Sequence, residues 1–377
     1  MVNRYYNEIK DKKYEFEISE VLIESCLKKL KNNKAVGDDN ICNEMLKYAK
    51  CNKLTIFLKN VFKDIINNGL SLENFNISLI SPIEKKDSNN SNPEDFRPIS
   101  VSTVFSNIYE MIILKQIEEV FNFNNKQFGY KANTSCKHAS FIINEAISYY
   151  KKGGSPCYVI SLDMKKAFDK RWRNELFSKL IDKIEQPIWR AIYIYYKFSK
   201  AKMKINNNKS DKFLIKEDVK QGGILSPYLF NFFMNDLLIE NDHQSDGAKI
   251  GKLNISLISY CDDLIILSPC INHVNKILQM CSDYAKKWKL VFNTSKCNWY
   301  VHGKSIIKNP LFLLNQNELR KVNSHIHLGL PMGNQNIVDD FFCEKFRKVE
   351  RTFYSLYSLG CNNHGLNYHT ISRDSYR

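Results

Sequence analysis

Long apolar runs are absent from this sequence. No stretch approaches the ~18 consecutive apolar residues that a membrane-spanning helix needs. The N-terminal segment MVNRYYNEIKDKKYEFE is too polar for a secretory signal. The eleven cysteines include no CxxC pair, and an odd number of scattered thiols is typical of reduced intracellular proteins. We therefore expect a chain of the cytoplasm and nucleus, without membrane contact.

Acidic residues are also in short supply. Asp and Glu number 40 against 55 Lys and Arg, which gives a net charge of +15. Such a surplus favours a polyanionic partner, with nucleic acid ahead of an anionic membrane, although a merely basic soluble protein remains the alternative. The 377 residues suffice for two or three packed lobes, and 44% hydrophobic residues exclude a wholly disordered chain.

Helical and strand patterns alternate without an internal repeat. Apolar spacing predicts helices over residues 18–30, 43–68, 104–120, 136–150, 172–200, 228–239, 272–289 and 339–359. Strands are expected at 157–163, 202–205 and 213–215, at a hairpin over 254–269, and at 290–293, 298–303 and 325–332. Because hairpins replace regular βαβ units, we predict an α+β fold with an antiparallel catalytic sheet.

The hairpin NISLISYCDDLIILSP, residues 254–269, holds two adjacent carboxylates, Asp262 and Asp263, among apolar residues. Neighbouring carboxylates in an apolar setting repel each other and lose hydration, so they need a cation or become protonated. An isolated pair of aspartates is also common in hairpin turns, which is the structural alternative.

A third aspartate, Asp163, ends the apolar strand that begins at Cys157. If this strand lies beside the hairpin, the three carboxylates converge, and a divalent metal supplies the missing positive charge. Mg²⁺ suits an all-oxygen site that is completed by water and substrate phosphates. Two such ions would stabilise the attacking and leaving oxygens of a phosphoryl transfer.

The motifs around these carboxylates resemble those of reverse transcriptases of non-LTR (LINE-type) retrotransposons, over about residues 30–360. In the order of that family the chain reads KAVGDDNICNEMLK (34–47), LISPIEKKD (79–87), PEDFRPIS (93–100), QFGYKANTSCKHA (127–139), SLDMKKAFD (161–169), VKQGGILSPYLFNFFMNDL (219–237), SYCDDL (259–264), WKLVFNTSKC (288–297) and HLGLPM (327–332). The resemblance implies a right-hand polymerase with a tail at 1–17, fingers at 18–155, a palm at 156–335 and a partial thumb at 336–377. It also implies an RNA template, a DNA primer and dNTPs as partners.

The resemblance further implies how the metals are held. Asp163 matches the first metal-binding carboxylate, and Asp262 with Asp263 matches the pair of the YxDD box. The peptide oxygen of Met164 would join them as a ligand. The expected cofactor is Mg²⁺, two ions, with Mn²⁺ as a substitute.

Other matched positions imply contacts with the nucleotide. Arg97 would grip the triphosphate with its bidentate guanidinium, and Lys85 would assist. Phe168 matches a steric gate against ribose, with a packed core aromatic as the alternative. Gln221 and Gly222 match the loop that lines nucleotide and template.

Two more family positions lie near the C-terminal end of the matched region. Lys296 matches the lysine beside the departing pyrophosphate, as a general acid, unless it is a plain surface charge. Leu328 and Gly329 match the tip of the primer-grip hairpin.

The chain departs from the family pattern in three places. Cys261 occupies the variable YxDD position, where alanine is commoner, and should touch the primer end. Residues 171–176, RWRNEL, follow AFDK where a small apolar residue is usual. The chain ends at Arg377, within the expected thumb and without the family's endonuclease, as expected of a portion of a longer element protein.

Two other interpretations stay open. A group II intron-type reverse transcriptase shares the QGGILSP-like and YxDD-like boxes, although RPIS and HLG argue against it. The second alternative is a truncated, inactive remnant that merely binds RNA. The filled catalytic positions argue against decay, and the incomplete thumb argues for it.

Overall fold

The structure of the chain is a computed structural model. It describes residues 1–49, 51–71, 74–84, 92–164, 170–206, 208–215, 220, 222–305, 307 and 309–358. Lys85, Phe168 and Gln221 from the sequence analysis lie outside the described residues.

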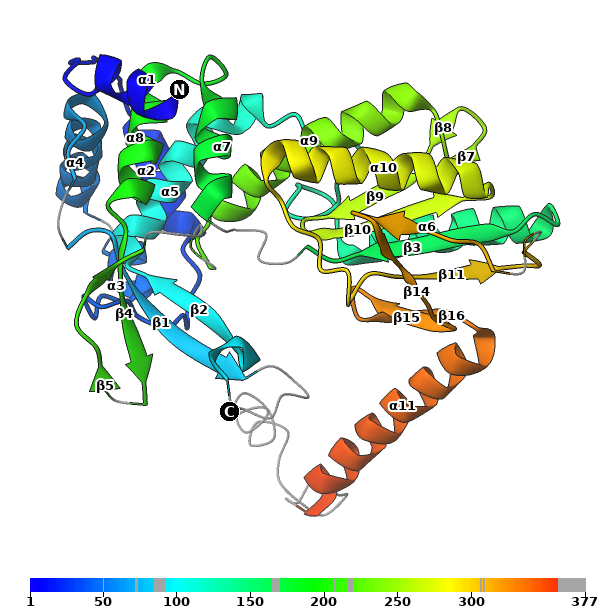
Figure 1. Cartoon of the computed structure of the whole chain (residues 1–377). Coiled ribbons are helices and arrows are strands. Elements are labelled where there is room, and N and C mark those ends of the chain that lie inside the picture. Colours follow the sequence, from blue (N-terminus) through cyan, green and yellow to red (C-terminus); the bar gives the residue numbers. More distant parts are fainter. Residues whose placement is uncertain are drawn as a thin grey trace.

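One half of the molecule holds most of the helices (Figure 1). Its helices are α1 (Val2–Ile9), α2 (Glu20–Lys29), α3 (Asn43–Lys47), α4 (Asn52–Asn68), α5 (Val104–Ile117), α7 (Lys170–Leu180) and α8 (Gln186–Lys197), with short 3₁₀ turns at Pro93–Asp95 and Glu118–Val120. Helices α2, α4, α5 and α8 contact one another because each buries one apolar face, as Phe62, Ile108 and Trp189 illustrate.

A twisted sheet extends from this helical half (Figure 1). Strands β1 (Ile77–Glu84) and β2 (Phe96–Ser102) pair antiparallel, and β4 (Lys200–Ile205) lies parallel to β1. Two short strands, β5 (Asn208–Lys209) and β6 (Phe213–Leu214), pair with β4. The hairpin of β1 and β2 is half exposed toward its tip, where Arg97 lies opposite Ile83.

The other half is built on a second sheet with the strand order β14-β11-β3-β10-β9. The strands are β3 (Cys157–Leu162), β9 (Leu257–Tyr260), β10 (Asp263–Ser268), β11 (Asn298–His302) and β14 (Arg320–Lys321). Strands β11, β3, β10 and β9 pair antiparallel. All six residues of β3 are buried, so this strand forms the centre of the sheet.

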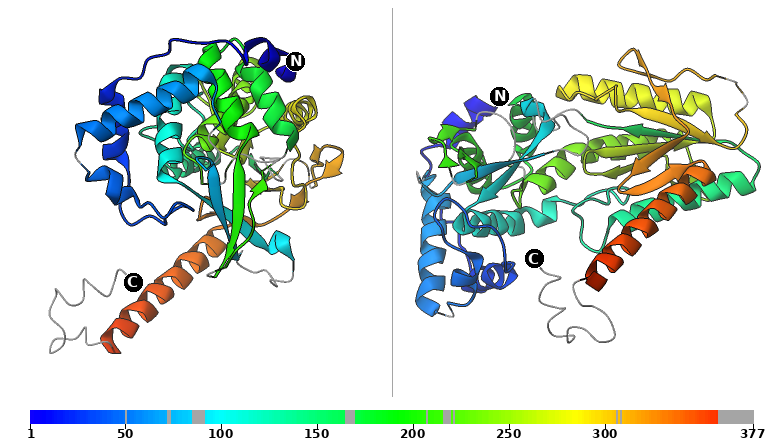
Figure 2. Two further views of the ribbon diagram at one scale, coloured as in Figure 1. Left: turned by 90° about the vertical axis from the view of Figure 1, so that its left-hand side faces the viewer. Right: turned by 90° about the horizontal axis from the view of Figure 1, so that it is seen from below.

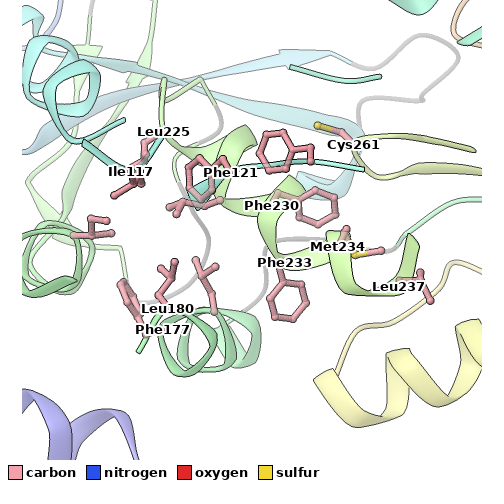
Figure 3. Packing of buried hydrophobic residues seen from close by; sticks show 14 of the residues in the cluster. Ile117, Phe121, Phe177, Leu180, Leu225, Phe230, Phe233, Met234, Leu237 and Cys261 are labelled. Carbon is pink, nitrogen blue, oxygen red and sulfur yellow. The ribbon is translucent and has the colours of Figure 1, made fainter. Parts of the chain in front are cut away.

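Helices cover both faces of this second sheet. Because side chains alternate along a strand, Tyr158 and Ile160 join the core beneath α9 (Ser226–Gln244) and α10 (Ile271–Trp288). Cys157 and Val159 point to the opposite face, where they pack with α6 (Cys136–Lys152). Figure 3 shows apolar side chains of α9 gathered with those of neighbouring segments.

The remaining elements are short hairpins and one long helix. The hairpins pair β7 (Lys249–Ile250) with β8 (Leu253–Asn254), β12 (Leu313–Leu314) with β13 (Asn317–Glu318), and β15 (Ser324–His327) with β16 (Leu330–Gly333). Helix α11 (Gln335–Ser358) follows β16 and leads away from the rest of the molecule (Figure 2). In the part of the chain described here, every helix is too short or too polar to cross a lipid bilayer.

The predicted α+β class with an antiparallel central sheet is confirmed, whereas several predicted elements are wrong in detail. Residues 43–68 and 172–200 each form two helices instead of one. Residues 290–293 form no strand, and Phe292 makes only an isolated bridge to Met164. Residues 1–17, expected as a tail, contain α1, whose Ile9 is buried.

Candidate active site

The two adjacent aspartates lie at the tip of the hairpin of β9 and β10. Tyr260 pairs with Asp263, so Cys261 and Asp262 form a two-residue turn. The backbone of Cys261 has φ +55°, in the left-handed region that such tight hairpin turns use. The hairpin turn that was the alternative explanation for the two aspartates is therefore present, and it places both carboxylates at the tip.

Asp163 lies beside this tip because β3 and β10 are neighbours. Leu162, the last residue of β3, pairs with Leu264, so Asp163 follows on the strand edge where Asp263 begins β10. Both carboxylates line a cavity of about 370 Å³. Residues that are 100 positions apart thus meet at one end of the central sheet.

The cluster of Asp163, Asp262 and Asp263 carries more negative charge than its neighbours compensate. Burial first, and then Asp262 and Asp163, raise the pKa of Asp263 to about 6 against the opposing effect of Lys296. Burial, and after it Asp163, also raises the pKa of Asp262. Lys296 is the nearby cation, and its Nζ lies 3.9 Å from Asp163 Oδ2. Its ammonium is largely exposed, so it compensates only part of the acidic charge.

This donor set fits a hard divalent cation. Among the described residues, no three His, Cys, Asp or Glu side chains are placed so that together they could hold a metal ion. Mg²⁺ does not require three such side chains, since it is commonly held by one or two carboxylates together with water and substrate phosphates. Burial and mutual repulsion raise these carboxyl pKa values, and a cation bound between the carboxylates would oppose both effects. The side chain of Met164 is buried in the core, which leaves only its backbone for the predicted ligand role.

Hydrogen bonds from Gln127, in the segment QFGYK, support the hairpin tip. Gln127 Oε1 accepts hydrogen bonds from the backbone N–H groups of Cys261 (3.1 Å) and Gly129 (2.9 Å), while its Nε2 donates to Ser259 Oγ. A Cβ on Gly129 would lie 2.8 Å from the Cys261 nitrogen, so only glycine permits this approach. From the sequence, this segment was recognised only as part of a family motif, and its support of the hairpin tip was missed.

The Cys261 side chain is turned toward the core. The thiol donates to Asn231 Oδ1 on α9 at 3.4 Å, and the residue is 8% exposed. Figure 3 shows Cys261 close to the apolar side chains of that helix. Little of this side chain is therefore open to a primer, contrary to the contact expected from the sequence.

The opposite side of the cavity is formed by β11 and the hairpin of β15 and β16. His325 shares a hydrogen bond of 3.0 Å with Ser161 Oγ, and its other ring nitrogen lies 3.2 Å from Asn298 Nδ2. Leu328 lines the cavity and forms, with Gly329, the turn between the two strands. The predicted tip position of these two residues is confirmed, whereas their contact with a primer stays a prediction.

Two of the predicted nucleotide contacts, Arg97 and Gly222, lie at the other sheet. Arg97 is exposed on β2. Gly222 lies against the same strand: a Cβ there would be 2.6 Å from the carbonyl oxygen of Ser100, and its φ is +113°. The glycine loop and the arginine strand are thus in contact, as the family motif implies for a shared nucleotide pocket.

Comparison with known proteins gives consistent matches. Residues 83–332 match the model of the family described as reverse transcriptase (RNA-dependent DNA polymerase). The chain is 25% identical over 285 residues to a probable RNA-directed DNA polymerase from transposon BS of Drosophila melanogaster, a match covering 73% of this chain and 31% of that protein. It is 26% identical over 322 residues to the RNA-directed DNA polymerase from mobile element jockey of Drosophila funebris, covering 82% and 34%.

These matches span about a third of the length of the curated relatives. Among solved structures, apo telomerase from Candida tropicalis, truncated from its C-terminal domain, aligns with a TM-score of 0.47 and 15% identity. That alignment covers 70% of this chain and 54% of the telomerase chain.

Proposed function

Because the chain belongs to the reverse transcriptase (RNA-dependent DNA polymerase) family, we propose that it adds dNTPs to the 3′-hydroxyl of a DNA primer on an RNA template. Its curated relatives come from mobile elements, which supports the non-LTR type suggested by the motifs. In this proposal the fingers comprise residues 18–155, the palm residues 156–335 with the central sheet, and the partial thumb residues 336–377. The observation that carries it is the meeting of Asp163 and Asp263 at one cavity.

The carboxylates Asp163, Asp262 and Asp263, with the backbone oxygen of Met164, would hold two Mg²⁺ ions. Bound there, the ions would stabilise the attacking and leaving oxygens of the phosphoryl transfer. The pairing of β3 with β10 fixes where the carboxylates of Asp163 and Asp263 begin at the edge of the cavity, and these side chains would hold the ions there. Mn²⁺ prefers similar oxygen donors and should substitute.

Positively charged side chains would neutralise the triphosphate. Arg97 suits phosphate oxygens because its guanidinium donates two parallel hydrogen bonds. Lys296, which lines the cavity beside Asp163, would donate a proton to the departing pyrophosphate. Its exposure and its single long contact with Asp163 leave the ammonium available for that role.

Nucleotide selection would depend on residues of two further segments. Gly222 would let the backbone approach the base pair, next to Gln221 in the sequence. Phe168 would exclude the ribose 2′-hydroxyl, and Lys85 would assist in phosphate binding. All of these substrate roles rest on the family motif.

Primer extension tests the proposal directly. Asp262→Asn removes one carboxylate charge while conserving its shape, so extension of a primed RNA template with Mg²⁺ should fall by more than about a hundredfold. Binding of the primed template, measured without dNTPs, should stay within about threefold, because phosphate contacts supply most of it.

A matched control is Asp283→Asn on α10, an exposed position that hydrogen-bonds Gln279. This variant should extend the primer at the parental rate. Extension by Asp262→Asn at that rate would refute the metal assignment. Template binding by the parental chain without any extension would favour the inactive RNA-binding remnant.

A further inference from the structure

A network of polar side chains is completely buried between the two halves of the molecule, outside the carboxylate site. It contains Glu110 of α5, Tyr195 of α8 and Lys220 of the loop before α9, all at most 5% exposed. Buried charges are costly unless every member is hydrogen-bonded, so such a network needs a physical reason.

Tyr195 links the two charged members. Its hydroxyl donates to Glu110 Oε1 and accepts a hydrogen bond of 2.9 Å from Lys220 Nζ. Lys220 Nζ also donates to Asn76 Oδ1, beside the start of β1. The ammonium and the carboxylate thus neutralise each other through one phenol, without direct contact.

The network reaches both ends of the glycine loop. Lys220 opens the loop, and its carbonyl oxygen accepts a hydrogen bond of 2.9 Å from the N–H of Gly223. At the other end, Glu110 Oε2 accepts one of 2.9 Å from the N–H of Leu225, just before α9. The turn from Lys220 to Leu225 is therefore tied to α5 and α8 by buried bonds at each end.

The same turn meets the strand that carries Arg97. Gly222 approaches the carbonyl of Ser100 so closely that any Cβ would collide with it. A small displacement of Gly222 would consequently shift the β2 backbone at Ser100, in the strand that carries Arg97. Protein cores transmit such displacements because they are densely packed.

We propose that Glu110, Tyr195 and Lys220 are positioning residues that hold the Gly222–Leu225 segment against β2 and thereby set the affinity for the incoming dNTP. The inference rests on the polymerase function proposed above. It assigns no chemical step to the three residues, because they lie beneath the loop and away from solvent. It predicts a change in nucleotide affinity rather than in template binding.

The charge of Lys220 supports this arrangement. Burial lowers the pKa of Lys220 to about 8, against the opposing effect of Glu110. At neutral pH, below this value, the ammonium donates hydrogen bonds to Asn76, Tyr195 and Ser106.

Tyr195→Phe is the most conservative test, since it removes only the linking hydroxyl. The matched control is Tyr193→Phe, on the same helix, whose hydroxyl donates to Asn3 Oδ1 at 3.0 Å in a separate contact. In primer extension, Tyr195→Phe should raise the KM for dNTP by about three- to tenfold, the range expected for one buried hydrogen bond. The kcat and the KM for primed template should stay within about twofold, and Tyr193→Phe should leave all three at parental values.

Hydrogen exchange provides a readout that needs no polymerase activity. The amides of Gly223 and Leu225 should exchange about three- to tenfold faster in Tyr195→Phe than in the parental chain, and at parental rates in Tyr193→Phe. Unchanged exchange in Tyr195→Phe, or an equal KM increase in both variants, overturns the proposal. A parental chain that extends no primer contradicts the proposed function, while the exchange result still decides whether the network holds the turn.

A second variant separates positioning from stability. The double substitution Glu110→Gln with Lys220→Met removes both buried charges together, so no charge is left unpaired. It should melt close to the parental temperature and still raise the dNTP KM by about threefold or more, because the ties to the turn are altered. A parental KM in this folded variant also overturns the proposal.

Discussion

Asp263 begins strand β10 with two further carboxylates close enough to oppose its ionisation. Its pKa of about 6, raised chiefly by burial and then by Asp262 and Asp163, exceeds the ordinary value of 3.8. For an acid with a raised folded pKa, the folded state binds more protons than the unfolded state between the two values. Its contribution to stability is therefore complete below the ordinary pKa and is lost as the pH rises through about 6.

This titration predicts a pH-dependent response to Mg²⁺. Thermal unfolding without metal should show stability falling between about pH 4 and pH 6.5 through this group, and Mg²⁺ should raise the melting temperature far more at about pH 7.5 than at about pH 5. At the lower pH the proton already occupies the carboxylate that the ion needs.

Asp263→Asn is the variant that tests the cause. Without metal at about pH 7.5 it should be more stable than the parental chain by about 1–2 kcal/mol, because a repelled charge is gone. It should also lose most of the Mg²⁺ response. An equal Mg²⁺ response at both pH values in the parental chain would show that the ion binds elsewhere.

At the residue scale, the sequence alone identified site residues wherever a charged side chain stands among apolar neighbours. Asp163, Asp262 and Asp263 are recognisable because apolar strands surround them. The support from Gln127 and Asn231 has no local signal, since their partner Cys261 is remote in sequence and the hydrogen bonds exist only in the fold. The buried pairing of Glu110 with Tyr195 was hidden for the same reason.

At the scale of the elements, one arginine side chain connects the ends of two helices. Arg190 of α8 is fully buried and donates to the carbonyl oxygens of Ile9, Lys10 and Lys12 after α1, and of Ile66 and Asn67 at the end of α4. These carbonyls have no partner within their own helices or lie beyond them. The planar guanidinium, whose donors point in fixed directions, can satisfy them together.

Arg190→Lys should therefore lower the free energy of unfolding by about 2–4 kcal/mol, since an ammonium has three donors and cannot reproduce the five hydrogen bonds of the guanidinium. Denaturant unfolding followed by circular dichroism measures this change. The control is Arg4→Lys on α1, an exposed residue paired with Glu8, which should change stability by less than about 0.5 kcal/mol. A loss that small for Arg190→Lys would mean that water satisfies the carbonyls.

Element boundaries show why the helix predictions failed where they did. Apolar residues recur at helical spacing over 172–200, yet Pro187 stands in the first turn of α8 and Asp182 adopts a left-handed backbone. Proline in a first turn is a recognised start signal, so this break was readable. The break after α3 carries no glycine or proline between residues 48 and 51 and depends on tertiary packing.

For the whole molecule, the α+β class followed from the sequence, whereas the sheet arrangement did not. Strand β4 lies parallel to β1 although more than 110 residues separate them, and the intervening chain passes through the central sheet. No local pattern encodes such a long-range pairing. The hairpin of β9 and β10, by contrast, was predictable because its turn and its two strands are contiguous.

The net charge of +15 is likewise a property of the whole chain, and it predicts how template binding responds to salt. Each phosphate contact releases a counterion, so affinity for primed RNA should fall by at least about tenfold between about 0.1 and 0.3 M KCl if three or more contacts form. A template of shuffled sequence should bind within about threefold, because phosphate contacts carry no sequence information. Fluorescence anisotropy on the Asp262→Asn variant measures both quantities without extension. An affinity that does not change with salt would exclude the basic surface as the template-binding surface.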